Sequence, residues 1–147
     1  MATTQLLGQQ KPAKLSSVFL ERIRISKDTL GSNCLGTALF ISGEVKSDDH
    51  INVETAYPLY FKRMLRVNTP VPGCLVAWVV DLENRISVEH CGVVTSTEPT
   101  LVTFRRGSAG AVMEDKPLDI AGGSYTEIAR THKDFCRIEY YIPKSLQ

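Results

Sequence analysis

Hydrophobic and polar residues follow a helical pattern in the first half of this chain. The turn-forming residues Gly31, Ser32 and Asn33 are followed directly by a run of small and apolar residues that begins at Cys34. The apolar positions of this run recur at helical spacing, and Gly43 supplies a stop signal. We therefore predict a helix that begins at Cys34 and has Ser32 or Asn33 as its N-cap.

Two flanking segments also carry helical signals. Residues 15–27 fit a helix through Phe19 and Ile23, or a strand through the alternation of isoleucine with arginine, and we favour the helix. Residues 53–65 fit a second helix that is interrupted near Pro58, because proline disfavours the helical conformation at the residue before it.

The pattern changes to strands in the second half. Residues 74–81 form a nearly continuous apolar run, which is typical of a buried strand. Residues 86–95 and 100–106 follow after short turns, and residues 135–143 form a last strand. This order predicts one α+β domain over residues 15–147, in which N-terminal helices pack on an antiparallel β-sheet meander.

Composition and charge are those of an ordinary single globular domain. The 147 residues include 17 basic and 16 acidic side chains, a balance that predicts neither nucleic acid nor a membrane as a partner. Residues 1–14 are polar and aperiodic, which predicts a flexible N-terminal arm, and they lack the apolar core of a secretory signal. The expected location is cytoplasmic, or outside the cell after export by a specialised secretion system.

The cysteines carry the candidate chemistry. They show neither a CxxC pair nor a His/Cys cluster at zinc-ligand spacing, so we expect free thiols, no metal and no cofactor. At the start of a helix, free N–H groups and the helix dipole would favour the thiolate of Cys34. The alternative is that Cys34 is a small buried core residue.

A cysteine nucleophile needs a base, and the chain has three histidines. His50 and His132 lie in polar turns and are most simply solvated. His90 lies within the second predicted strand, two residues before Gly92. On a sheet packed against the helix of Cys34, an imidazole there would face the sulfur, and the glycine would leave room for a substrate.

Three short motifs occur in a compact order along the chain. They are Asn33-Cys34-Leu35-Gly36, Pro72-Gly73-Cys74-Leu75-Val76 and His90-Cys91-Gly92-Val93. In this order they resemble the NlpC/P60 family of papain-like cysteine peptidases, over roughly residues 30–107. The resemblance implies a papain-like fold with Cys34 as the nucleophile, His90 as the base, and Thr103 in the following strand as the third catalytic residue.

The chain departs from the family pattern at several of these positions. Asn33 and Cys74 replace acidic residues, and Thr103 replaces the more frequent His, Asn or Gln. A threonine hydroxyl orients an imidazole less well than an amide or a carboxylate does. A catalytic dyad, or a papain-like binding domain without activity, therefore remains an alternative.

The resemblance implies a thiol hydrolase that cleaves an amide bond, most simply in a bacterial cell-wall (peptidoglycan) peptide. Cys34 would attack the carbonyl carbon, and His90 would protonate the leaving amine. The substrate-binding residues that we expect are Asn33, Trp78, Gly92 and Arg105, with Arg106 as a second ligand for a carboxylate. Core packing of Trp78 and solvation of the two arginines are the alternatives.

The same chemistry allows other functions. A cell-wall peptidase without a signal peptide would be a bacterial effector exported by a specialised system, or would act on cytoplasmic peptides. For an effector, a cognate inhibitor or immunity protein would be a further partner. A deamidase or acyl hydrolase of a protein substrate would use the same Cys34 and His90.

Overall fold

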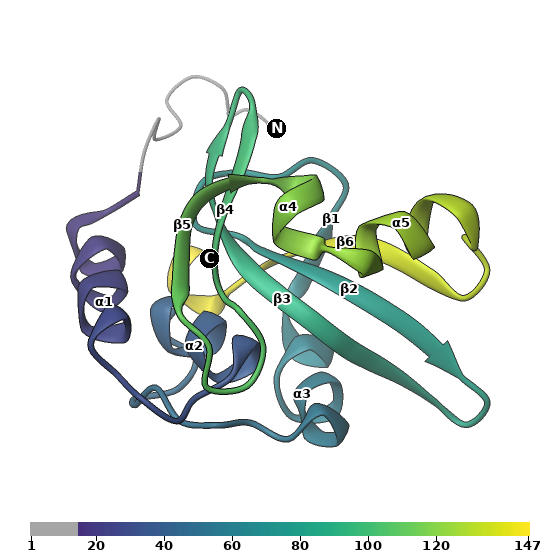
Figure 1. The fold of residues 1–147 in the computed structure, drawn as a ribbon, viewed down its shortest axis with the longest axis horizontal. Coiled ribbons are helices and arrows are strands. Elements are labelled where there is room, and N and C mark those ends of the chain that lie inside the picture. The colour runs from purple at the N-terminus through teal and green to yellow at the C-terminus, as the bar shows by residue number, and fades with distance from the viewer. Residues whose placement is uncertain (1–14) are drawn as a thin grey trace.

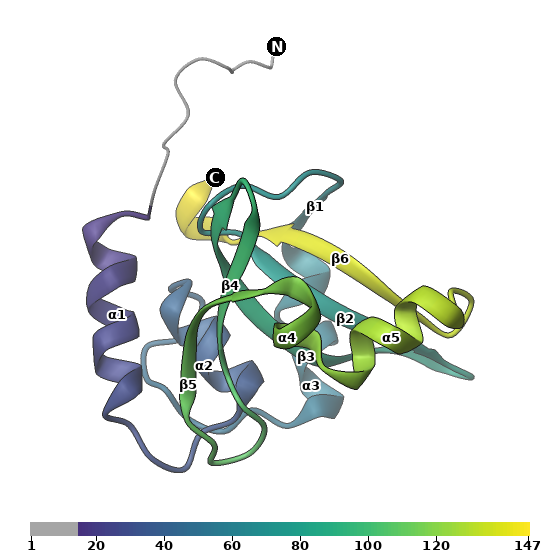
Figure 2. The ribbon, with the colours of Figure 1, turned by 45° about the horizontal axis from the view of Figure 1, so that its top comes forward.

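The computed structural model describes residues 15–147, which form a six-stranded antiparallel sheet with helices on both of its faces (Figures 1 and 2). The strands are β1 (Leu65–Val67), β2 (Leu75–Leu82), β3 (Arg85–Thr97), β4 (Thr100–Arg105), β5 (Val112–Pro117) and β6 (Cys136–Ile142). The fold therefore belongs to the predicted α+β class. The predicted N-terminal arm, residues 1–14, lies outside the described residues.

The helices fall into an N-terminal and a C-terminal group. They are α1 (Ser17–Lys27), α2 (Cys34–Ile41), α3 (Val53–Leu59), η1 (Phe61–Arg63), α4 (Leu118–Gly122), α5 (Ser124–Thr131) and η2 (Lys144–Leu146). The helix predicted over residues 15–27 is confirmed by α1. The helix predicted over residues 53–65 ends earlier, with Pro58 in the last turn of α3, and Leu65 already belongs to β1.

The strands follow the order β1-β6-β2-β3-β4-β5 across the sheet. The segment from β2 to β5 is a meander, as predicted for its first three strands. The last strand, β6, does not extend the meander but lies between β1 and β2. The sequence patterns did not predict β1, β5, α4 or α5.

Each face of the sheet carries its own core. In β2, alternate side chains point to opposite faces, so Leu75, Ala77 and Val79 pack with the N-terminal helices. Val76 and Trp78 pack with residues of β4 and with Ala121 of α4 on the other face. Both faces of β2 are thus covered, which explains its continuous apolar run.

The N-terminus of α2 is fixed to the loop that follows this helix. Asn33 is the N-cap, as predicted, and its side-chain oxygen accepts from Gly36 N at 2.8 Å and from Ile51 N at 3.2 Å. Its amide nitrogen donates to Ile51 O at 2.8 Å. A Cβ atom on Gly36 would lie 1.9 Å from Asp49 O, so only glycine allows this approach. Gly43 has φ +88° directly after the helix, the conformation expected of a C-terminal stop.

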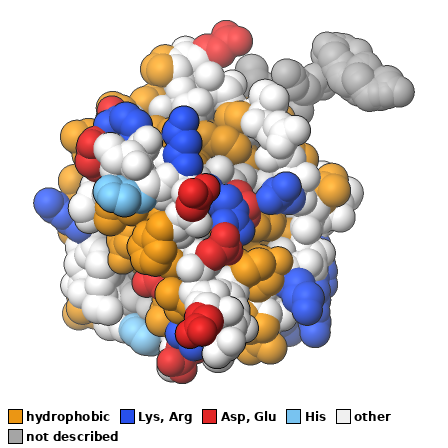
Figure 3. Space-filling model, turned by 90° about the vertical axis from the view of Figure 1, so that its right-hand side faces the viewer, with side chains coloured by type: hydrophobic (Ala, Val, Ile, Leu, Met, Phe, Trp, Pro, Cys, Tyr) orange, Lys and Arg blue, Asp and Glu red, His pale blue; other side chains and the backbone are white. Residues whose placement is uncertain are grey.

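The surface mixes charges of both signs. On the side where the β2–β3 hairpin ends, acidic and basic side chains alternate with hydrophobic ones (Figure 3). Within residues 15–147, no helix is long and apolar enough to cross a membrane.

Candidate active site

Cys34 lines a surface pocket at the N-terminus of α2. This pocket, called here the Cys34 pocket, has a volume of about 370 Å³. It is lined by Asn33, Cys34, Leu35, His50, Asn52, Val53, Glu89, Gly107 and Ser108. Cys34 itself is 7% exposed, so a small part of its surface reaches the solvent.

Cys34 packs against β3. The part of β3 before Val93 pairs with β2 but not with β4, and its side chains Val88 and Cys91 share a core with α2. Burial raises the pKa of Cys34 above its usual value, and outweighs the lowering effect of the nearby backbone groups of Cys91 and Leu35. The prediction of a lowered pKa at this position is therefore wrong for the free protein, in which Cys34 is a thiol.

His90 is held in an aromatic environment on the other side of β3. Its ring lies 5.1 Å from Trp78, 5.7 Å from Phe104 and 6.1 Å from Tyr125, nearly parallel to the last. Nε2 lies 2.7 Å from the backbone oxygen of Ala121. A carbonyl oxygen only accepts, so this contact assigns the proton to Nε2 and leaves Nδ1 of the neutral ring as an acceptor. Burial lowers the pKa of His90, which favours that neutral form.

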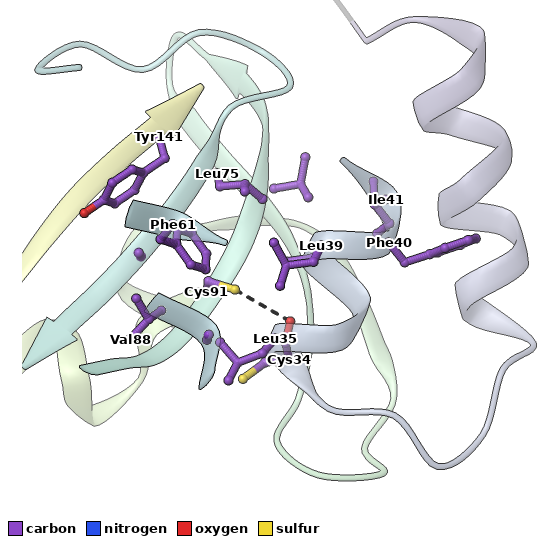
Figure 4. Packing of buried hydrophobic residues seen from close by; sticks show 14 of the residues in the cluster. Cys34, Leu35, Leu39, Phe40, Ile41, Phe61, Leu75, Val88, Cys91 and Tyr141 are labelled. Carbon is purple, nitrogen blue, oxygen red and sulfur yellow. Dashed lines mark hydrogen bonds between the residues drawn. The ribbon is translucent and has the colours of Figure 1, made fainter. Parts of the chain in front are cut away.

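No hydrogen bond within residues 15–147 joins the Cys34 sulfur to His90. Cys91, the residue next to His90, is the one that faces α2, and its thiol donates to Cys34 O at 3.7 Å (Figure 4). His90 lines a second pocket, of about 340 Å³, together with Arg106, Tyr125 and the segment from Ile120 to Ser124. Gly107 lines both pockets, so the His90 pocket adjoins the Cys34 pocket at this residue.

Thr103 and Gly92 do not take their predicted places. The hydroxyl of Thr103 accepts from Asp115 N at 3.2 Å, and Thr103 pairs with Val93, whose side chain faces the N-terminal helices. Thr103 is therefore not the partner of His90. Gly92 leaves no room for a substrate, because a Cβ atom there would lie 2.5 Å from Val102 Cγ1.

Trp78 and Arg105 are structural residues. Trp78 is fully buried, and its Nε1 donates to Thr126 Oγ1 at 3.0 Å, so it is not a cleft wall. Arg105 is 3% exposed and pairs with Asp48 at 3.0 Å, which excludes it as a carboxylate ligand for a substrate. Asn33 does line the Cys34 pocket, but its side-chain amide is occupied by the N-cap contacts.

Of three further charged or titratable residues at these pockets, His50 and Glu89 were missed or set aside, and Arg106 was predicted only as a second carboxylate ligand. His50, which seemed a solvated loop residue, lines the Cys34 pocket. Arg106 is exposed and lines the His90 pocket. Glu89 has no partner in β2, because Trp78 pairs with His90 and Val79 with Val88. This β-bulge turns Glu89 toward the Cys34 pocket, and no sequence pattern marks it.

The described residues offer no cluster of three or more His, Cys, Asp or Glu side chains that could hold a metal ion. Searches with the whole chain find no matching protein family, no matching curated protein and no matching solved structure.

Proposed function

We propose that this protein is a cysteine hydrolase on a papain-like scaffold of the NlpC/P60 kind, which cleaves an amide bond in a cell-wall peptide. The supporting observation is the hydrogen bond between His90 Nε2 and the Ala121 carbonyl. It holds a neutral imidazole with Nδ1 free to accept a proton, one residue before Cys91, whose thiol donates to the carbonyl oxygen of Cys34. The three motifs that resemble the family supply the assignment to this class.

The protonation states favour general-base catalysis over a resting thiolate–imidazolium pair. Both the thiol of Cys34 and the ring of His90 are neutral in the free protein. Nδ1 of His90 takes the thiol proton as the sulfur attacks the carbonyl carbon, through water where the His90 pocket and the Cys34 pocket adjoin at Gly107. The same proton then passes to the leaving amine, and water attacks the thioester carbonyl to release the acid.

The Ala121 carbonyl takes over the orienting role that we predicted for Thr103. In a triad, the third group fixes the tautomer and the direction of the imidazole. A backbone carbonyl does both, but it carries no full negative charge and stabilises imidazolium less than a carboxylate. Arg106, instead of the buried Arg105, is the guanidinium that a substrate carboxylate can reach.

The proposal is tested by hydrolysis of purified cell-wall peptides, followed by mass spectrometry. We expect wild-type protein to cleave, Cys34→Ser to lose cleavage entirely, and His90→Gln to lose about 10²–10⁴-fold. Thr103→Val is the matched control and should stay within about twofold, because Thr103 does not contact His90. Cleavage that survives in Cys34→Ser would contradict the proposal.

The separate placement of Cys34 and His90 favours a second candidate, a binding domain on the same scaffold. Alkylation by iodoacetamide separates the two. A hydrolase should be alkylated at Cys34 in the folded state and more slowly after His90→Gln, whereas Cys74, Cys91 and Cys136 are fully buried and should react only on unfolding. If Cys34 reacts no faster than these three, the binding domain is the better account. Alkylation at Cys34 without cleavage of wall peptides would direct the search to amide bonds of protein substrates.

A further inference from the structure

Glu89 places an acidic group beside Cys34. As the extra residue of the bulge between β2 and β3, it is half-buried and lines the Cys34 pocket. Burial is the main cause of the raised pKa of Cys34 and of Tyr125, and the negative charge of Glu89 raises both pKa values further.

The carboxylate of Glu89 has no basic partner among residues 15–147. Its hydrogen bond is to the hydroxyl of Ser87, which donates to Oε2 at 2.5 Å. Glu139 shows the contrast, because both Arg66 and Arg137 pair with its carboxylate at 2.7 Å. Burying part of a carboxylate without a cation costs free energy of desolvation. Unpaired charges of this kind are found preferentially in pockets that bind a ligand.

We propose that Glu89 is the cation-binding residue of this site, and that a primary ammonium group of the ligand pairs with it in the Cys34 pocket. The inference rests on the proposed function, since it treats Cys34 as the reacting group. It narrows the substrates to peptides that carry a free amine close to the scissile amide. A bound cation also offsets the charge of Glu89, which adds to the effect of burial in raising the pKa of Cys34.

A pair of thiol reagents of similar length and opposite charge tests this directly. The cationic trimethylammonium-ethyl and the anionic sulfonatoethyl methanethiosulfonates both form a mixed disulfide with a thiol. Methanesulfinate leaves, and the thiol proton passes to solvent. The rate at Cys34 is read by peptide mass spectrometry at pH 8, where an ordinary imidazole carries no charge. Each rate is divided by that of a free small thiol.

We expect wild-type protein to prefer the cationic reagent, and Glu89→Gln to reduce this preference by about tenfold, the equivalent of one pKa unit. Glu83→Gln is the matched control, because Glu83 is exposed in the turn between β2 and β3, and it should keep the wild-type preference. An equal preference in wild type and Glu89→Gln would overturn the inference, as would a Cys34 that neither reagent reaches.

The labelling test is independent of catalysis. Failure of the proposed cation site can therefore be distinguished from failure of the proposed hydrolase function. A charge preference that depends on Glu89, in a protein that cleaves no wall peptide, removes the cell-wall hydrolase proposal and leaves the cation site. Cleavage of wall peptides without such a preference removes the cation site alone. Thermal unfolding of Glu89→Gln, compared with Glu83→Gln, checks that the variant is folded.

Discussion

At the scale of the residue, burial decides the protonation of His90. Its ring is enclosed by aromatic side chains, and the folded protein holds it neutral with a lowered pKa. As the pH falls below about 6.5, the ordinary value of histidine, the unfolded chain therefore binds a proton that the folded protein refuses. The folded state loses stability as the pH falls, and keeps this contribution in full only above that range.

We expect the free energy of unfolding in urea to fall between pH 7.5 and 5.5, with a contribution from His90 of up to about 1.4 kcal/mol per pH unit. His90→Gln should lose that part of the pH dependence. His132→Gln, at an exposed position, should retain it. A pH slope unchanged by His90→Gln would mean that the ring titrates in the folded protein as it does in the unfolded chain.

Residue positions in the site were easier to predict than residue environments. The sequence placed Cys34 at the first turn of a helix because capping by Asn33 is a local property. The direction of its pKa shift depends on burial against β3, which no local pattern contains. The partner of His90 was missed for a related reason, since Ala121 contributes only a backbone carbonyl, and any residue type carries one.

At the scale of the element, α2 is held in place by a buried ion pair. Arg105 of β4 donates to Thr37 Oγ1 at 2.6 Å, and to Asp48 Oδ2 at 3.0 Å. Thr37 in turn donates to Asp48 Oδ1 at 2.9 Å. These contacts connect the first turn of the helix to the sheet, and so determine where Cys34 lies. Removal of Arg105 would leave the carboxylate of Asp48 buried without a cation.

We expect Arg105→Ala to lower the free energy of unfolding in urea by about 3–5 kcal/mol, the usual effect of an uncompensated buried charge. Arg106→Ala, one residue further along and exposed, should change it by less than about 0.5 kcal/mol. If both variants unfold at the same urea concentration, the buried pair does not anchor α2.

Helices and strands with a clear hydrophobic pattern were predictable from the sequence, and those without such a pattern were not. The apolar alternation of β3 and β4 marks them as strands, and the run of β2 marks a strand covered on both faces. The segment from Gly107 to Gly123 contains β5 and α4 but has only half-buried or exposed residues over β5. β5 is a strand because it pairs with β4, since its own sequence has no strand pattern.

At the scale of the whole molecule, the last strand of the chain lies inside the sheet, between β1 and β2. β6 pairs with β1 on one side and with β2 on the other, after α4 and α5 have covered the second face (Figure 2). The meander from β2 to β5 is local in sequence, whereas the pairing of Leu75 with Tyr141 joins residues far apart in the chain. The sheet is therefore complete only when the C-terminal residues are in place.

This topology predicts the order of amide hydrogen exchange. Amides of β6 should exchange as slowly as those of β2, through global unfolding, although β6 lies near the C-terminus where fraying is common. Amides of α1 should exchange faster, because this helix buries only Phe19, Ile23 and Ser26 and lies at the side of the molecule (Figure 1). Exchange followed by peptide mass spectrometry measures all three segments in one experiment. Fast exchange over residues 136–142 would show that the meander is stable without its last strand, and the site on β3 would then not depend on the C-terminal segment.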